Sequence, residues 1–250
     1  MKKTLALIMA LAMMVCLFAG CADGGEKYII ATDTAFPPFE IPGEDGSMSG
    51  IDMDILAAIA EDQGFEYEIQ PLGFDAALAA LEAKQCDGVI AGASITEERL
   101  KTYDFSEPYY DSGVVMAIKA NNEEIKGYED LAGKTVAAKR GTEGATFAES
   151  IKEKYAIADI VLFDESPMMY EAVKSGNAVA CFEDYPVMGY GIANGNGLKM
   201  VTEKEQGSSY GFAVLKGENA ELLKMFNEGL KNIKENGKYQ EIIDKYISAE

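Results

Sequence analysis

Histidine and tryptophan are absent from this 250-residue chain, and only four cysteines occur. Without histidine, Ser-His-Asp catalysis, Cys-His catalysis and histidine-ligated metal sites are all excluded. Two of the cysteines, Cys86 and Cys181, lie far from the N-terminus, and each stands beside an apolar run. We therefore expect two buried, unreactive thiols there rather than a disulfide.

Basic residues are also scarce, since 22 Lys and Arg stand against 42 Asp and Glu for a formal net charge of −20. Nucleic acids and anionic membrane surfaces both favour clustered Lys and Arg, so the composition argues against either partner. The hydrophobic content of 48% is enough for one large domain or two modest ones. Gly133-Lys134-Thr135 lacks the earlier glycine of a phosphate loop, because position 128 is Tyr128. We expect a monomer that needs no cofactor.

The N-terminus has the pattern of a secretory signal over residues 1–20. Lys2 and Lys3 precede an apolar run over residues 5–18, which is shorter than the roughly 20 residues that span a bilayer. The end of the run resembles a lipoprotein cleavage box, in which Cys21 would become the lipidated first residue. Phe18 departs from the usual Leu of that box, and ordinary cleavage near Ala22 is the alternative. Residues 21–27 would form a flexible tether.

From Lys27 onward, short apolar runs alternate with stretches of helical periodicity, which is typical of βαβ units on a largely parallel sheet. After the turn at Pro108-Tyr109-Tyr110, the pattern predicts a crossing to a second unit built in the same way. No low-complexity linker separates the units, which suits a chain that crosses twice. The expected strands cover residues 28–31, 66–70, 88–91, 113–119, 134–139, 160–163, 178–182, 198–202 and 210–215, and the expected helices residues 54–63, 75–84, 142–155, 167–174, 220–235 and 239–247, with a further helix from Pro186.

The stretch from Gly92 to Arg99 is the first candidate for a binding site. An apolar run ends there in small residues, and Thr96 followed by two glutamates predicts the start of a short helix. Free backbone N–H groups and the planar fork of Arg99 would suit a small carboxylate. A capped surface helix with a solvent-facing arginine is the alternative.

Aromatic and acidic residues follow other predicted strands. Phe36 and Phe74 each come after a strand end, where open α/β sheets bind ligands, although burial in the core is the commoner fate of such rings. Asp184 ends the strand over residues 178–182 and precedes a helix, so it is either a ligand group or a helix cap. Thr142 opens a helix whose N-terminus is a second candidate anion site.

The runs over residues 33–40, 50–54, 92–99 and 104–110 occur in the order and spacing of the polar amino-acid-binding proteins of ABC importers. From about Lys27 to its C-terminus, the chain resembles the glutamine-binding branch of these type II extracytoplasmic solute receptors. The resemblance implies a two-lobed, periplasmic-binding-protein-like type II α/β fold, each lobe a mixed, mostly parallel sheet flanked by helices. Lobe 1 would comprise residues 28–110 and 211–250, and lobe 2 residues 113–206.

By the same resemblance, a polar amino acid would bind between the lobes, and an ABC permease would recognise the closed form. Asp184 would receive the ligand's α-ammonium group, and Arg99, Ser94 and Thr142 would hold its α-carboxylate. The protein would lie outside the cytoplasm and contact the membrane only through its lipid anchor. The full set of expected ligand-binding residues is Asp33, Phe36, Phe74, Gly92, Ser94, Arg99, Lys139, Thr142, Glu183 and Asp184.

The ligand's side chain is predicted from three charged positions. The resemblance directs Asp33 and Glu183 toward the distal end of the ligand, which favours a cationic arginine or lysine. Lys139 falls at a lysine position of the glutamine-binding branch and would cancel much of the pull of Asp33 on a guanidinium. Glutamine is therefore the first choice of ligand and arginine the second. Glu183 reduces the preference for glutamine, because a second acid favours a cationic ligand.

Two other classes of protein share this fold. One is a cyclohexadienyl dehydratase with Glu183 as general acid and Lys139 nearby, and turnover of arogenate or prephenate would reveal it. The other is a sensor domain that reports its ligand to a kinase. A sensor needs a transmembrane helix and a signalling domain, and these 250 residues contain neither pattern. Fold alone does not choose among these classes.

The leader pattern generates a prediction about anchoring. Replacing Cys21 by Ser should release the protein from membranes into the medium or periplasm, because the acylated residue is lost. Fractionation of cells that express each form measures the effect. A wild-type protein that is already wholly soluble would contradict lipidation.

Overall fold

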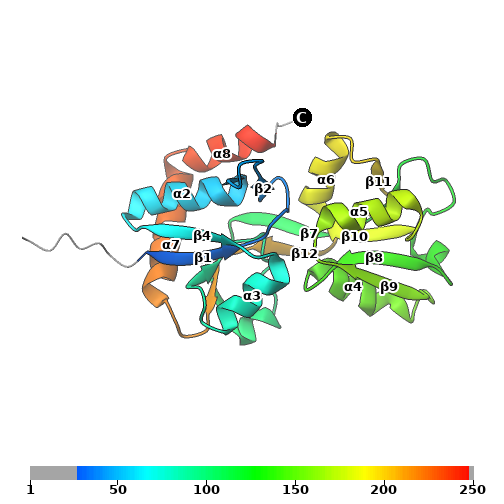
Figure 1. The fold of residues 1–250 in the computed structure, drawn as a ribbon, viewed down its shortest axis with the longest axis horizontal. Coiled ribbons are helices and arrows are strands. Elements are labelled where there is room, and N and C mark those ends of the chain that lie inside the picture. The colour runs from blue at the N-terminus through cyan, green and yellow to red at the C-terminus, as the bar shows by residue number, and fades with distance from the viewer. Residues whose placement is uncertain (1–26, 248–250) are drawn as a thin grey trace, which may run out of the picture.

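The computed structural model describes residues 27–247, which form two α/β lobes, each a sheet with helices on both faces (Figure 1). The expected α/β architecture is confirmed. The expected signal over residues 1–20, Cys21 and most of the tether lie outside the described residues. Within residues 27–247, no helix combines the length and apolarity needed to cross a bilayer.

The first lobe is built on a five-stranded sheet in the order β4-β1-β5-β13-β6. Strand β1 runs parallel to β4 and β5, whereas β13 is antiparallel to β5 and β6. Successive residues point to opposite faces, so Ile30 packs with the core under α2 and α7 while Ala31 packs with the core under α3. The elements are β1 (Tyr28–Thr32), α2 (Ile51–Gln63), β4 (Tyr67–Pro71), α3 (Phe74–Glu82), β5 (Gly88–Val89), β6 (Tyr103–Phe105), β13 (Ala213–Leu215), α7 (Ala220–Glu235) and α8 (Lys238–Tyr246).

The second lobe repeats this layering on a sheet in the order β11-β7-β10-β8-β9, with β12 also paired to β7. Strands β10, β8 and β9 are parallel, and β7 is antiparallel to its neighbours. Phe182 faces the core under α4, and its neighbour Cys181 faces the core under α5 and α6. The elements are β7 (Tyr110–Lys119), β8 (Thr135–Lys139), α4 (Glu143–Lys152), β9 (Asp159–Phe163), α5 (Ser166–Ser175), β10 (Ala180–Asp184), α6 (Tyr185–Ala193), β11 (Leu198–Met200) and β12 (Glu205–Tyr210).

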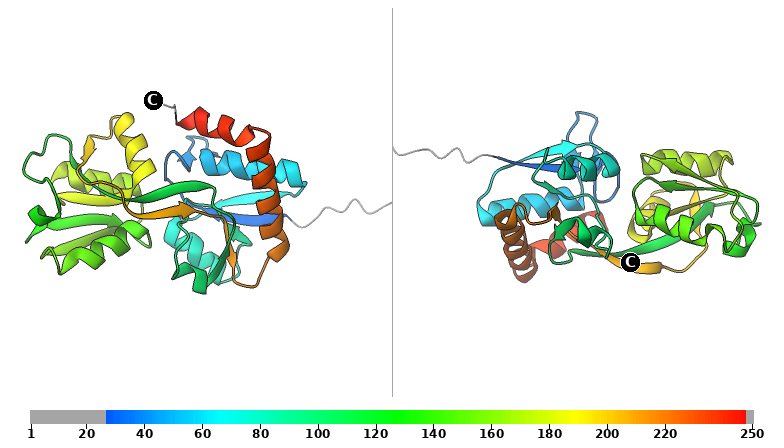
Figure 2. Two further views of the ribbon diagram at one scale, coloured as in Figure 1. Left: turned by 180° about the vertical axis from the view of Figure 1, so that it is seen from behind. Right: turned by 90° about the horizontal axis from the view of Figure 1, so that it is seen from below.

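Strands β7 and β12 join the lobes and lie side by side between them (Figure 2). Their antiparallel pairing places Tyr210 opposite Tyr110. Backbone bonds tie the end of β12 to the first lobe, since Tyr109 N donates to Tyr210 O at 2.9 Å and Gly211 N to Ala93 O at 3.0 Å. The chain therefore crosses forward on β7 and returns on β12.

Most expected elements are present, with shifts of a few residues at their ends. Helix α2 begins at Ile51 rather than residue 54, and its N-cap is Gly50 at φ 126°. Only glycine fits this N-cap, because an added Cβ would lie 2.1 Å from Phe39 O. The short helix expected after Thr96 is only the three-residue 3₁₀ turn η2 (Arg99–Lys101), whose first N–H bonds to Thr96 Oγ1 at 3.2 Å. Cys86 and Cys181 are both buried and free, as predicted.

The run expected as one strand over residues 210–215 is divided between the lobes. Tyr210 ends β12 in the second sheet, and Ala213 begins β13 in the first. Gly211 lies between them, where an added Cβ would approach Ile95 and Phe105 to about 3 Å. Four short elements were not predicted, namely β2 (Ile41–Pro42), β3 (Met48–Ser49), β6 and the 3₁₀ turn η3 (Tyr128–Leu131), and β12 was predicted only at its last residue.

Candidate functional site

One cavity lies between the carboxyl ends of strands from both sheets. Its lining includes nine of the ten residues that the sequence singled out, together with Ala91 and Glu143. The cavity measures about 10 Å³, which is room for roughly one water molecule. The nine are Asp33, Phe36, Phe74, Gly92, Ser94, Arg99, Lys139, Thr142 and Asp184.

Phe36 and Gly92 form the part of the cavity lining that we call the first-lobe wall, and they are in close contact. Gly92 adopts φ 54°, and an added Cβ would lie 2.6 Å from the Phe36 ring, so only glycine fits. Two residues on, Ser94 pairs with Tyr210 across a β-bridge. The Ser94 hydroxyl lies 3.3 Å from that of Ser208. The turn after β5 is thus held from both sides.

Arg99 connects the two lobes. Its guanidinium donates to Ser94 O at 2.8 Å in its own lobe and to Gly141 O at 2.9 Å in the other. The same group lies 5.0 Å from the ring centroid of Phe74, within the range of a cation–π contact. Burial lowers the pKa of Arg99, and Glu143 and Asp184 oppose that shift. The side chain offers five N–H donors, of which these bonds use two.

A buried ion pair between Asp33 and Lys139 also bridges the lobes. Both side chains are 1% exposed. Asp33 follows β1 and also accepts a bond from Thr34 N at 2.7 Å, whereas Lys139 ends β8. The Lys139 ammonium lies 4.8 Å from the ring centroid of Phe36. The cavity therefore contains a cation and an anion that already neutralise each other.

Asp184, at the end of β10, carries the second buried carboxyl of the cavity. It accepts a hydrogen bond of 2.6 Å from the Tyr210 hydroxyl, and no side-chain cap forms at the start of α6. Burial, followed by the neighbouring charge of Glu183, raises the pKa of Asp184 to about 7. Arg99 and the Tyr210 bond act in the opposite direction.

Thr142 is the N-cap of α4. Its hydroxyl donates to Lys139 O at 2.7 Å and accepts from Ala145 N at 3.4 Å. Gly141 precedes it at φ 73°, and an added Cβ there would lie 2.8 Å from Asp75 Oδ1 of the other lobe. The N-terminus of α4 therefore faces the first lobe at short range.

Glu183 is the one expected residue that does not line the cavity. Its carboxylate accepts from Ser166 Oγ at 2.6 Å, Tyr170 OH at 2.9 Å and Asp184 N at 3.0 Å. The sequence reasoning did not single out Ser166, Tyr170 or Tyr210, because nothing in their local pattern marks them as partners of buried acids. Glu143 carries a weak signal, since it is the acid that follows the expected cap Thr142.

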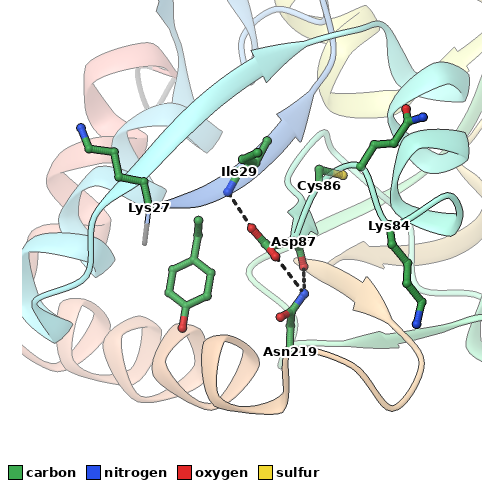
Figure 3. A pocket seen from close by; sticks show the side chains of 8 residues that line it. Lys27, Ile29, Lys84, Cys86, Asp87 and Asn219 are labelled. Carbon is green, nitrogen blue, oxygen red and sulfur yellow. Dashed lines mark hydrogen bonds between the residues drawn. The ribbon is translucent and has the colours of Figure 1, made fainter. Parts of the chain in front are cut away.

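A larger hollow lies at the opposite end of the first sheet, among Lys27, Ile29, Lys84, Asp87 and Asn219 (Figure 3). Its volume is about 370 Å³. The polar groups in it bind one another, since Asp87 accepts from Ile29 N at 2.8 Å and Asn219 Nδ2 donates to Asp87 O at 2.9 Å. Lys84 is paired with Glu218. This hollow lacks the convergence of charges from two lobes that the smaller cavity has.

Residues 27–247 contain no group of three or more His, Cys, Asp or Glu arranged to hold a metal ion.

Comparisons with known proteins agree on one family. Residues 28–249 match the model of bacterial extracellular solute-binding proteins, family 3. The chain is 31% identical to the arginine-binding periplasmic protein of Mannheimia haemolytica over the full length of both.

Two solved structures are similar to this one at nearly equal sequence identity. An ancestral arginine-binding protein bound to glutamine is 36% identical, with a TM-score of 0.81 over 89% of this chain and 98% of that one. The Lactococcus lactis GlnP substrate binding domain 2 in open conformation is 37% identical, with a TM-score of 0.63 over 91% and 97%. The glutamine-bound relative therefore superposes better, although its sequence is no closer.

The Asp33–Lys139 pair generates a prediction about stability. Asp33→Asn or Lys139→Met alone should lower the free energy of unfolding by about 3–5 kcal/mol, because each leaves a buried charge without its partner. The double variant should cost less than the sum, with a coupling above about 1 kcal/mol. Urea denaturation of the wild type, the two single variants and the double variant measures the free energy of unfolding of each.

The exposed ion pair Arg140–Asp164 is the matched control. Arg140 Nε lies 3.0 Å from Asp164 Oδ1, and the side chains of Arg140 and Asp164 are 46% and 81% exposed. Its coupling should stay below about 1 kcal/mol. Additive effects of the Asp33 and Lys139 substitutions would contradict the bridging role.

Proposed function

This chain belongs to family 3 of the bacterial extracellular solute-binding proteins, and we propose that it binds glutamine between its lobes and delivers it to an ABC permease. Membership identifies it as an extracytoplasmic amino-acid receptor of an ABC importer. The finer proposal assigns residues 28–110 and 211–250 to lobe 1 and residues 113–206 to lobe 2. Arginine is the second choice of ligand.

The observation that carries the proposal is the arrangement of opposite charges in the cavity. The guanidinium of Arg99 comes from one lobe and the carboxyl of Asp184 from the other, and both line the same small space. An α-amino acid presents a carboxylate and an ammonium group a few ångströms apart. The carboxylate would bind the fork of Arg99 with Ser94 and the N-terminus of α4, and the ammonium would bind Asp184.

Binding in this site would require the lobes to open. A cavity of about 10 Å³ cannot admit an amino acid, and Arg99 and the Asp33–Lys139 pair hold the lobes together around it. The better superposition on the glutamine-bound relative than on the open one supports a closed arrangement here. A ligand that contacts both lobes stabilises the closed form, and the permease would recognise that form.

The charge balance at Asp33 favours glutamine. Lys139 already neutralises Asp33, so a guanidinium would gain little there and would meet a like charge. An amide can both donate to Asp33 and accept from Lys139. The charge of Glu183 was the sequence argument for a cationic ligand. Glu183 accepts hydrogen bonds from Ser166 and Tyr170 and does not line the cavity.

The same position of Glu183 weighs against the dehydratase alternative. A general acid must reach the substrate to transfer its proton. Nothing among the described residues favours this alternative, and the relatives named above are binding proteins by their descriptions. We keep the lipid anchor at Cys21, which the leader pattern predicts, and the monomeric state as parts of the proposal.

A competition experiment tests the choice of ligand. Calorimetric titration of the wild type should give tighter binding of glutamine than of arginine. Lys139→Ala should raise the ratio of arginine to glutamine affinity by roughly tenfold or more, because it removes the like charge. Tighter binding of arginine by the wild type would refute the first choice.

The role of Arg99 predicts a loss of affinity. Arg99→Ala should weaken glutamine binding by roughly 2–5 kcal/mol, since the buried α-carboxylate loses its partner. Arg99→Lys should also weaken it, because an ammonium lacks the bidentate geometry. Arg140→Ala, at an exposed arginine, is the control and should change binding by less than about 0.5 kcal/mol. Unchanged affinity in both Arg99 variants would reject the role.

Asp184 predicts a dependence of affinity on pH. The α-ammonium needs the ionised carboxylate, and the raised pKa of about 7 means that Asp184 gains a proton as the pH falls below that value. Affinity should therefore decrease by up to about tenfold per pH unit below 7. Asp184→Asn should bind weakly and without this slope, whereas exposed Asp164→Asn should behave like the wild type. A wild-type affinity that is constant from pH 5 to pH 8 would contradict the assignment.

A further inference from the structure

Two carboxyl groups lie buried behind the cavity without lining it. Glu40 and Asp52 are both 0% exposed. Glu40 follows the loop that carries Phe36, and Asp52 lies in the first turn of α2. The proposed binding of an amino acid uses neither group. Buried carboxyls are costly unless every oxygen finds a partner, so their presence requires an explanation.

Each carboxyl has one oxygen with a polar neighbour and one without. Asp52 Oδ2 accepts from Gly92 N and from Tyr109 OH, both at 2.8 Å. Glu40 Oε1 lies 3.3 Å from Thr32 Oγ1, which donates its single proton to Ile90 O at 2.6 Å. Within residues 27–247, Asp52 Oδ1 and Glu40 Oε2 have no hydrogen-bond donor. The two residues are neighbours in space, because Asp52 N donates to Phe39 O at 3.2 Å and Glu40 follows Phe39 directly.

A proton between the two groups would satisfy both oxygens at once. Burial, followed by the charge of Asp52, raises the pKa of Glu40 well above its usual value. Burial also raises the pKa of Asp52, but bonds from Glu40, Gly92 and Tyr109 favour its charged form. These donors place the charge on Asp52 and the proton on Glu40.

The pair is connected to both parts of the first-lobe wall. The Glu40 backbone exchanges two bonds with Phe36, with N···O distances of 2.9 and 3.1 Å. The Asp52 side chain holds the N–H of Gly92, whose Cα packs against the Phe36 ring. A bond between Glu40 and Asp52 therefore closes a ring of contacts around these two cavity residues.

We propose that Glu40 and Asp52 share one proton, and that this bond positions Phe36 and Gly92 for the ligand. The affinity part of this inference rests on the proposed function. Loss of the proton at alkaline pH leaves two adjacent buried carboxylates, which repel each other. This repulsion would separate Glu40, which is bonded to Phe36, from Asp52, which is bonded to Gly92. The other titratable groups that face the pair are Asp33 and Lys139 from the cavity side and Tyr109 and Tyr239 from the opposite side.

Infrared difference spectroscopy tests the shared proton without any ligand. At neutral pH, the spectrum of the wild type minus that of Glu40→Gln should contain the C=O stretch of a protonated carboxyl. Asp62→Asn is the matched control, because Asp62 lies on the same helix as Asp52 and its bonds to Asn232 and Gln63 lower its pKa. That difference spectrum should contain carboxylate bands only. A Glu40→Gln difference without the protonated-carboxyl band overturns the proposal.

Asp52→Asn provides a second route if Glu40→Gln does not fold. Its amide replaces the carboxylate that accepts the proton, so the C=O stretch of Glu40 should shift in frequency, and an unshifted band overturns the sharing of the proton. A wild-type spectrum with no protonated-carboxyl band overturns the proposal without any variant. Glu183 and Asp184 also have raised pKa values, so the difference spectra rather than the wild-type band alone support it.

Stability provides a second ligand-free readout. A carboxyl whose pKa is raised on folding adds stability at low pH that is lost as the pH rises through the folded pKa. The stability of the wild type relative to Glu40→Gln should therefore decline as the pH rises above the ordinary value of 4.5. A difference that stays constant with pH overturns the proposal.

Glutamine affinity tests the positioning role. Glu40→Gln keeps a donor to Asp52, so it should bind at neutral pH like the wild type and keep its affinity at alkaline pH, where the wild type weakens. Glu40→Ala removes the donor and should bind roughly tenfold more weakly at every pH. Equal affinities of all three proteins across the range overturn positioning. If no amino acid binds to the wild type, the proposed function is refuted instead. The infrared test of the shared proton still applies in that case, because it uses no ligand.

Discussion

The contact between Asp33 and Lys139 ties the end of β1 in one sheet to the end of β8 in the other. An ion pair that is 1% exposed on both sides is stable only while both lobes surround it, because opening brings water to each charge. The pair therefore couples the arrangement of the lobes to the electrostatics of the cavity. Lys139 packs on Phe36 in the same arrangement, so the ion pair and the aromatic wall form together.

Around this pair, the remaining charges are distributed between the lobes rather than within one of them. Arg99 spans the gap through Gly141, and Tyr210, on the returning strand β12, holds Asp184. Because Tyr210 also pairs with Tyr110 and Ser94, the strand that connects the lobes directly supports a proposed ligand group. Movement of the lobes and occupation of the cavity would thus be linked through the same few residues.

The sequence predicted the parts of the fold that have a strong local period. Helix α7 has the bounds expected from its pattern, and the site residues converge because the carboxyl ends of parallel strands in both sheets face the same cavity. Strand β12, with the sequence EQGSSY, has no apolar alternation, and only its pairing with β7 forms it. The partners of Glu183 come from α5, 13 and 17 residues earlier in the chain, and no local signal links them to it. The roles of the site residues remain predictions that binding experiments must decide.

The most direct test of the central claim is a crystal structure of the protein grown with glutamine. The account predicts glutamine between the lobes, with its α-carboxylate on Arg99, its α-ammonium on Asp184 and its side-chain amide beside Asp33 and Lys139. Glutamine bound in the reverse orientation, or in the hollow between Lys27 and Asn219, would contradict it.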